Sequence, residues 1–424
     1  MKNYFVISAP IDTYSGYGAR ARDFVKALIE SNKYEIKILS QRWGNTRKGF
    51  LADHPEWEFM QKYIVDGLTQ QPDIWCQVTV PNEFQKVGKY NIGLTAGIET
   101  TACAPQWIEG CNRMDLVLTS SKHSKHVFEQ TKYKIQHPQT KQEQELKLTT
   151  PVEVLFEGAN LDVYTGVKEF TNKDLYNYIS DIPEKFVYLF VGHWLQGELG
   201  QDRKNVGLLV KTFYEAFKNK KKKPALILKA STGVGSYVSR DEILDKIKKI
   251  RASVDSKLLP NIYLLTGEFN DKEMNELYNH PKVKAMVSLT KGEGYGRPLL
   301  EFSLTGKPIM ASGWSGHVDF LNPEYVTLLP GKLEKVHKSA ANQWLLEDAE
   351  WFAADPTATA QAFRDMFKNY KSYLSKSKRQ KYYAKKNFSW EKMDELFQKE
   401  LNENIPDFPK KVSLNLPKLN TPTL

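Results

Sequence analysis

The sequence predicts an α/β protein with two domains, each built on a parallel sheet covered by helices. At 424 residues, the chain exceeds the length that one hydrophobic core usually serves. Short β-rich runs alternate with helical patterns from the first residue onward, which is typical of parallel sheets. The series of strands restarts after the polar, proline-bearing residues 180–185, SDIPEK, which we interpret as an interdomain linker.

The first predicted domain, residues 1–183, is expected to be Rossmann-like. Its candidate strands are Tyr4–Ala9, Tyr34–Leu39, Ile74–Val78, Ile92–Ala96, Leu116–Ser120 and Val152–Phe156. The N-terminal apolar run ends at Pro10 and Asp12 after only about eight residues, which indicates a buried strand rather than a signal peptide. We therefore expect a cytoplasmic protein.

The second predicted domain, residues 184–387, is also expected to be Rossmann-like. Its strands begin at Phe186 (FVYLFVG), Ala225 (ALILKAS), Ile262 (IYLLTGE), Ala285 (AMVSLT) and Pro308 (PIMAS). After Leu329 the pattern turns helical and basic. Residues 388–424 are expected to form a helix that crosses back toward the first domain, followed by an extended tail from Ile405.

Composition excludes several classes of protein. With 41% hydrophobic and 26% charged residues, the chain has enough apolar surface for real cores, which argues against a disordered or fibrous protein. No segment has the length of a membrane span. Cys76, Cys103 and Cys111 lack metal or disulfide spacing. The formal charge of +10 favours an anionic partner.

One stretch of the second domain carries the chemistry: EGYGRPLLE, residues 293–301. It follows a buried strand, and proline at the second position of the predicted helix is typical of a helix start. The free N–H groups and positive dipole end of such a helix attract phosphate. Glu293 precedes this anion site and Glu301 lies about one turn into the helix. A nucleotide sugar fits this arrangement, with its ribose beside Glu301 and its sugar near Glu293.

These residues resemble the donor site of family 4 glycosyltransferases and their retaining relatives. The carriers of the resemblance are E-x7-E followed by TGKP, VEVLFEGANLDVY at residues 152–164, VGH at 191–193 with RKN at 203–205, and FSW at 388–390. The resemblance spans nearly the whole chain. It implies GT-B architecture, in which two Rossmann-like domains face each other across a deep cleft.

The resemblance implies roles for individual positions. Lys204 and Arg203 would neutralise the donor diphosphate, and Glu301 would bind the ribose hydroxyls. Glu293 would act as the catalytic carboxylate on the transferred sugar. The remaining donor-binding residues would be Gly16 and Gly18 in SGYGARARDF, Lys229, Tyr295, Gly296 and Arg297. Lys229 either reaches the same phosphates or only caps the end of its strand.

The sequence departs from the family at two places. His193 replaces the usual arginine of V-G-R, and a polar insert separates it from Lys204. The first domain lacks the family's histidine after its central strand and has Glu99 there instead. Glu99 is our candidate for a catalytic carboxylate on the acceptor side, and its alternative is a cap on the helix expected near Pro105.

The resemblance implies transfer of a sugar from a nucleotide sugar with retention of the configuration at the anomeric carbon. UDP is the favoured nucleotide because the family commonly uses it. A phosphate oxygen of the leaving group takes the proton of the acceptor on the same face of the sugar, while lysine, arginine and a helix end stabilise the leaving diphosphate. We expect no metal and no other cofactor.

The sequence indicates less about the acceptor substrate than about the donor. Residues 371–386, KSYLSKSKRQKYYAKK, carry seven basic side chains, no acid and interleaved tyrosines, so Lys378, Arg379 and Lys381 are candidates for nucleic-acid binding. The stretches SGYGARARDF, AGIETT, WIEGCNRMD and SSKHSKHVF resemble glycosyltransferases of large tailed phages, some of which modify hydroxymethylated bases in viral DNA. Such an acceptor base would be flipped into the cleft.

Two other functions stay open. A transferase acting on a lipid-linked or cell-surface glycan would bind the surface of an anionic membrane, and peripheral contact with a membrane fits the basic charge. A domain pair that had lost turnover would serve as a binding module for nucleotide sugars or nucleic acids, and the missing arginine of V-G-R is a change of that kind.

Overall fold

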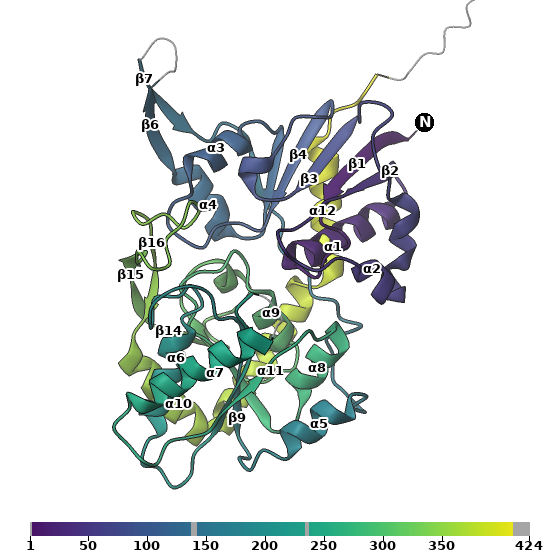
Figure 1. Ribbon diagram of the computed structural model, residues 1–424. Coiled ribbons are helices and arrows are strands. Elements are labelled where there is room, and N and C mark those ends of the chain that lie inside the picture. The colour runs from purple at the N-terminus through teal and green to yellow at the C-terminus, as the bar shows by residue number, and fades with distance from the viewer. Residues whose placement is uncertain (1, 137–141, 234–236, 410–424) are drawn as a thin grey trace, which may run out of the picture.

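The computed structural model describes residues 2–136, 142–233 and 237–409, and its main feature is a pair of six-stranded parallel sheets. Figure 1 shows one sheet above the other, with the earlier half of the chain in the upper part. Each sheet is built from alternating strands and helices, as the sequence pattern predicts. The α/β class and the two Rossmann-like domains are therefore confirmed.

The first sheet has the strand order β2-β1-β3-β4-β5-β8. Its strands are β1 Asn3–Ala9, β2 Tyr34–Ser40, β3 Ile74–Val78, β4 Tyr90–Thr95, β5 Leu116–Thr119 and β8 Val152–Val154. The interior strand β1 is almost entirely buried because both faces of the sheet are covered, which explains its continuous apolar run. Each predicted strand of this domain is present to within a few residues.

The second sheet has the strand order β11-β10-β9-β12-β13-β14. Its strands are β9 Val187–His193, β10 Ala225–Ser231, β11 Ile262–Leu265, β12 Val283–Ser288, β13 Ile309–Ser312 and β14 Thr327–Leu329. In sequence order this is 3-2-1-4-5-6, the order of doubly wound nucleotide-binding sheets. The order reverses between β9 and β12, and ligands of such sheets bind at that point, beyond the carboxyl ends of the strands.

Helices cover both sheets and are amphipathic where they pack on them. They are α1 Gly16–Ser31, α2 Phe50–Asp53, α3 Pro105–Cys111, α4 Lys122–Gln130, α5 Lys173–Ser180, α6 Val206–Phe217, α7 Tyr237–Ala252, α8 Asp271–Asn279, α9 Arg297–Ser303, α10 Pro356–Lys368, α11 Tyr370–Asn387 and α12 Trp390–Asn404. Within the described residues, none is both long and apolar enough to cross a bilayer.

Two antiparallel hairpins were not predicted. The first pairs β6, Lys132–Gln136, with β7, Glu143–Lys147. The second pairs β15, Gly331–Lys335, with β16, Glu350–Ala354, so the prediction of helices directly after Leu329 is wrong. Trp351 of β16 is fully buried, and that burial secures a hairpin whose other strand is mostly polar.

The second hairpin contacts the first domain. Thr101 and Glu350 exchange two hydrogen bonds of 2.9 Å, and the ring of Trp344 lies 5.9 Å from that of Trp107. These contacts fix one side of the interface between the two domains. In Figure 1 the hairpin lies between the two sheets at the left of the molecule.

The chain itself crosses between the two domains twice. Apolar side chains between Ala159 and Ile182, which precede the predicted boundary at residues 183 and 184, pack in the core of the second sheet. At the other end of the chain, α12 returns to the first domain and buries Trp390, Phe397 and Leu401 in the core beside α1. The predicted tail from Ile405 falls largely on residues 410–424, which lie outside the described residues.

Candidate functional site

The loops after β9 and β12 meet where the strand order of the second sheet reverses. The first loop ends at Arg203 and Lys204, just before α6, and the second is Lys291–Gly296, just before α9. The amide of Lys291 donates to the carbonyl of Arg203 at 2.8 Å, and the Arg203 guanidinium donates to the carbonyl of Gly292 at 3.0 Å. The polar insert after His193 therefore ends with Arg203 and Lys204 beside residues 291–296, which we call the donor loop.

A compact charge cluster forms at this meeting point. The ammonium of Lys204 pairs directly with the Glu293 carboxylate, and Arg203 lies 3.5 Å from the same carboxylate. Glu293 is only 8% exposed. Burial alone would raise the pKa of Glu293, but the adjacent charges of Lys204 and Arg203 outweigh it and lower this pKa to about 2. Glu293 is therefore ionised at any physiological pH.

Glu99 reaches this cluster from the first domain. Its carboxylate lies 3.5 Å from Arg203, so one guanidinium serves a carboxylate from each domain. The backbones also touch, since a Cβ at Gly292 would lie 1.8 Å from the carbonyl oxygen of Glu99. The sequence predicted both acids as catalytic candidates, and the structure brings them to one guanidinium.

A turn after β13, Ser315–His317, clamps the backbone of Glu293. The Glu293 amide donates to the Ser315 hydroxyl at 2.9 Å, and the Gly316 amide donates to the Glu293 carbonyl at 3.0 Å. Ser315 has a φ of 77°, a conformation that costs a non-glycine residue about 1–3 kcal/mol and often marks functional sites. The sequence assigned no role to Ser315 or Gly316, although small residues directly after a buried strand were a signal for such a turn.

His317 is buried beside Glu293. Its Nε2 lies 2.7 Å from the carbonyl of Ser312 and so carries the proton, since a carbonyl only accepts. Burial lowers the pKa of His317 and keeps the ring neutral. Its Nδ1 is an acceptor with no hydrogen-bond partner among the described residues, which leaves one polar contact for a ligand or a water to make.

Tyr295 and Gly296 complete the donor loop. Tyr295 is 3% exposed and packs against Phe320, so its side chain supports the loop from within. Gly296 has a φ of 98° and stands directly before α9, a conformation that glycine adopts without strain. Both leave backbone amides, rather than side chains, for a bound anion to contact.

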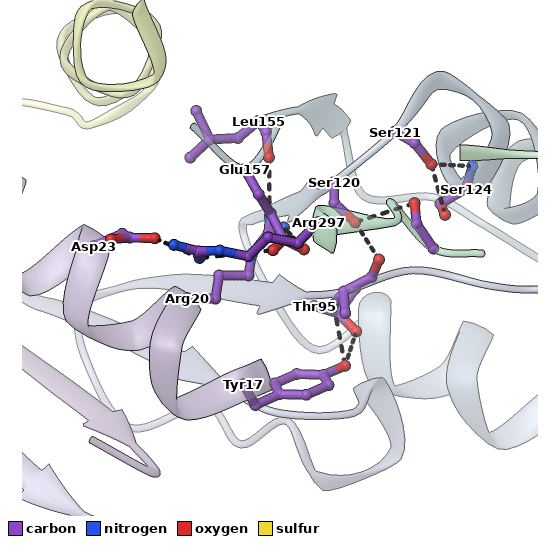
Figure 2. A network of polar contacts seen from close by, with 12 residues as sticks. Tyr17, Arg20, Asp23, Thr95, Ser120, Ser121, Ser124, Leu155, Glu157 and Arg297 are labelled. Atoms are coloured by element: carbon purple, nitrogen blue, oxygen red, sulfur yellow. Dashed lines mark hydrogen bonds and ion pairs between the residues drawn. The ribbon is translucent and has the colours of Figure 1, made fainter. Parts of the chain in front are cut away.

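Arg297 points toward Asp23 and Glu157, both of which belong to the first domain (Figure 2). Its guanidinium lies 2.8 Å from Asp23 on α1, 4.0 Å from Glu157 and 3.0 Å from Glu301. Arg20 supports the same cluster through Glu157 at 3.2 Å and the carbonyl of Leu155 at 2.9 Å. The side chain assigned to donor binding thus joins the two domains.

Glu301 is buried in this cluster and competes with two other acids for Arg297. Burial raises the pKa of Glu301 to about 7, against the opposing charge of Arg297. Because the folded pKa lies above the ordinary value of 4.5, the folded chain binds more protons between pH 4.5 and about 7, so Glu301 lowers stability as pH rises through this window.

Glu301→Gln should therefore raise the free energy of unfolding of the ligand-free protein at pH 8, by up to about 3 kcal/mol. Denaturant unfolding of both proteins from pH 4.5 to pH 8 measures the difference. The gain should shrink as pH falls toward 4.5 and vanish below it, where Glu301 is protonated in both the folded and the unfolded state. Glu324→Gln, at an exposed position, is the matched control and should change nothing. A glutamine variant that is less stable at pH 8 contradicts the assignment.

The remaining predicted donor residues lie around this centre. Gly18 packs tightly on the preceding turn, where a Cβ would lie 2.5 Å from the carbonyl oxygen of Thr13, whereas Gly16 faces open space. Lys229 donates to the carbonyl of Gly267 at 2.5 Å and lies over the ring of Phe269 at 4.3 Å. No contact in the described part of the chain joins Lys229 to Lys204 or Glu293.

The basic residues of α11 lie apart from the donor loop. Lys378 and Arg379 are exposed and line a concavity of about 460 Å³ together with Tyr325 and Tyr382. The Lys381 stem packs over Gly306, just beyond the far end of α9 from Gly296. Across residues 2–136, 142–233 and 237–409, no group of three or more His, Cys, Asp or Glu side chains is arranged to hold a metal ion.

Comparisons with known proteins bear on the fold. No family model matches the chain, and no curated protein matches it in sequence. Among solved structures, a sucrose-phosphate synthase from Thermosynechococcus elongatus aligns with a TM-score of 0.63 at 12% identity, over 95% of this chain and 99% of its own. A glycosyltransferase from Rickettsia africae aligns with a TM-score of 0.59 at 14% identity, over 96% of this chain and 100% of its own.

A third structure, HepE from Anabaena in complex with UDP and glucose, aligns with a TM-score of 0.58 at 12% identity, over 95% of this chain and 100% of its own. All three alignments span both sheets. The chain has the GT-B fold. In the GT-B arrangement seen here, the cluster of Lys204, Arg203 and Glu293 lies on the second domain and faces Glu99 on the first.

Proposed function

We propose that this protein is a retaining glycosyltransferase that moves a sugar from a UDP-sugar to a hydroxyl acceptor. The observation that carries the proposal is the cluster of Lys204, Arg203 and Glu293 where the strand order reverses, closed by Glu99 from the facing domain. Two cations beside an ionised, buried carboxylate suit such a donor. The cations stabilise the diphosphate as it leaves, and the carboxylate stabilises the positive charge that develops on the sugar.

The charges of the cluster indicate how a nucleotide-sugar donor would bind and react. The two carboxylates of Glu99 and Glu293 form ion pairs with Arg203 and Lys204. A diphosphate that takes over these cations frees Glu293 to face the sugar. As the bond from the anomeric carbon to the diphosphate breaks, Lys204 and Arg203 stabilise the leaving oxygens. A phosphate oxygen takes the acceptor proton while the acceptor oxygen bonds to the same face of the carbon.

The choice of UDP is supported by a neighbour of the same fold, since the HepE structure holds UDP and glucose. Glu301 is proposed to bind the ribose, and Gly16 leaves open space at the start of α1 where the donor would lie. This scheme uses no metal and no other cofactor. The N-terminal apolar run forms the buried strand β1, and the cytoplasm is part of this proposal as the location of the reaction.

For the acceptor, we propose a hydroxymethylated base in DNA, as in proteins encoded by tailed phages, where the site would be the host cytoplasm. The basic face of α11 with its exposed tyrosine supports this choice. The alternative acceptor is a lipid-linked or cell-surface glycan. The alternative class is a module that binds a nucleotide sugar or nucleic acid without turnover.

The deciding experiment incubates the protein with a panel of UDP-sugars, first alone and then with DNA that contains hydroxymethylcytosine. Slow release of UDP without acceptor supports a transferase, and its absence for every donor indicates a binding module. A hexose or pentose mass increment on the nucleosides, seen by mass spectrometry, identifies the acceptor. Donor hydrolysis without this increment directs the search to glycan and lipid acceptors.

The basic face of α11 makes a separate prediction. Replacing Lys378, Arg379 and Lys381 together with glutamate should weaken binding to duplex DNA by about tenfold or more. The slope of log affinity against log salt concentration should become less steep by about three. Donor hydrolysis should not change, because α11 lies at the far end of α9 from Gly296. The exposed cluster Lys220, Lys221 and Lys222 supplies a control with the same charge change. Unchanged affinity removes α11 from the proposal.

A further inference from the structure

An aromatic pair on the first domain is anchored to the donor loop. The rings of Tyr17 and Trp43 are stacked, with centroids 4.0 Å apart and an interplanar angle of 24°. Tyr17 is held in place from the other end, because its hydroxyl lies 3.0 Å from the Thr95 hydroxyl and accepts from the Ala96 amide at 3.0 Å. Figure 2 shows this hydroxyl pointing at Thr95, away from α1. The pair is therefore a rigid platform.

The platform is joined to the reaction centre by a short chain of contacts. The Ser120 hydroxyl bonds the carbonyl of Ala96 and lies 3.4 Å from the carbonyl of Gly294 in the donor loop. A Cβ at Gly294 would lie 2.3 Å from the carbonyl oxygen of Ala96, so the two backbones touch. The residue that holds Tyr17 thus also contacts the neighbour of Glu293.

Trp43 belongs to a loop with a distinctive charge. Residues 41–48, QRWGNTRK, follow β2 and carry three cations, one aromatic side chain and no acid. Arg47 is engaged by Asp53 at 2.6 Å and by Glu268 at 3.5 Å. Arg42 and Lys48 are exposed, and neither forms an ion pair with any described residue. Two cations beside the platform therefore face solvent.

The loop is held in one shape. The Tyr14 amide donates to the carbonyl of Arg47 at 3.1 Å, and Gly49 donates to the carbonyl of Asp12 at 3.1 Å. A β-bridge pairs Thr13 with Lys48. Because Thr13 and Tyr14 lead directly into α1, the loop and the platform form one unit at the carboxyl edge of the first sheet.

We propose that this unit, residues 41–48 together with Tyr17, binds a single-stranded segment of polynucleotide and presents its base to the donor. This inference rests on the proposed function and assigns its acceptor site. Aromatic side chains stack on any base, and cations beside them bind the phosphates. A lipid surface would require bulky apolar side chains beyond Trp43, and the loop has none.

The experiment measures binding of a fluorescein-labelled dT12 strand to the full chain over a range of salt concentrations. Trp43→Ala should weaken binding by about 5- to 100-fold, and Trp43→Phe should keep most of the affinity. Arg42→Glu with Lys48→Glu should weaken it at least about tenfold and reduce the salt slope by about two. Lys221→Glu with Lys222→Glu changes the charge equally on the second domain and should have a much smaller effect.

Donor hydrolysis separates a failure of this inference from a failure of the proposed function. All four variants should hydrolyse a UDP-sugar at the wild-type rate, since none alters Lys204, Arg203 or Glu293. Two outcomes would overturn the polynucleotide site while hydrolysis persists. In the first, Trp43→Ala binds dT12 as tightly as the variant with Lys221→Glu and Lys222→Glu. In the second, heparin binds through residues 41–48 and dT12 does not. Absence of hydrolysis in the wild type instead overturns the proposed transferase.

Discussion

Donor hydrolysis should fall by about 100- to 1,000-fold in Glu293→Ala, while affinity for UDP should stay the same or rise. Turnover falls because the carboxylate that faces the developing positive charge is gone. Affinity is kept because the substitution frees Lys204 and Arg203 from a competing carboxylate, so both become available to the diphosphate. Steady-state hydrolysis and calorimetric titration with UDP measure the two effects separately.

Two comparisons make this result specific. Glu293→Gln keeps the shape of the side chain and should lose turnover to a similar degree, since the effect depends on charge. Glu301→Ala should instead weaken donor binding with a smaller effect on turnover, because it is assigned to the ribose. If Glu293→Ala loses UDP affinity and Glu301→Ala loses turnover, the two roles have been assigned the wrong way round.

Gly292→Ala should separate the two domains at the reaction centre. The added Cβ would lie 1.8 Å from the carbonyl oxygen of Glu99 and 3.0 Å from its Cα, and neither backbone atom can move without shifting the loop after β4. Since a misplacement of about 1 Å can cost about 100-fold in rate, hydrolysis should fall at least that far. Small-angle scattering should show a larger radius of gyration for the variant than for the wild type.

The matched control is Gly166→Ala, where an added Cβ would meet no heavy atom within 4 Å. Circular dichroism of both variants should be unchanged, because Gly292 lies in a loop and each sheet keeps its own core. A Gly292→Ala protein with wild-type hydrolysis and wild-type scattering would show that the contact between Gly292 and Glu99 is not required for the reaction.

Local pattern was enough to predict most of the strands. The buried strands read as continuous apolar runs with turn residues after them, and this signal is independent of distant contacts. The hairpin of β15 and β16 escaped prediction because its stability comes from Trp351 and from contacts with the first domain. Such contacts join residues about 250 positions apart, as between Thr101 and Glu350, and leave no local trace.

In the candidate site, too, features set by local sequence were predicted and features set by contacts between distant residues were not. The resemblance to the family assigned Glu293, Lys204 and Arg203 to one donor site. In the structure they meet because the loops of neighbouring strands converge at the point where the strand order reverses. Arg297 was assigned to the donor from its position in the motif, but its side chain pairs with Asp23 of α1, 274 residues away in sequence. The stacking of Trp43 on Tyr17 likewise depends on how β1 and β2 pair.

The return of α12 to the first domain has a consequence for synthesis of the chain. Met393, Phe397 and Leu401 complete a core whose other members include Phe5, Phe24 and Leu28. Domains generally fold as they leave the ribosome, the N-terminal one first. Here the N-terminal domain must wait for the last helix to be translated, with its apolar surface beside α1 uncovered until then. A ribosome that stops before residue 390 would release a chain with that surface exposed to chaperones and proteases.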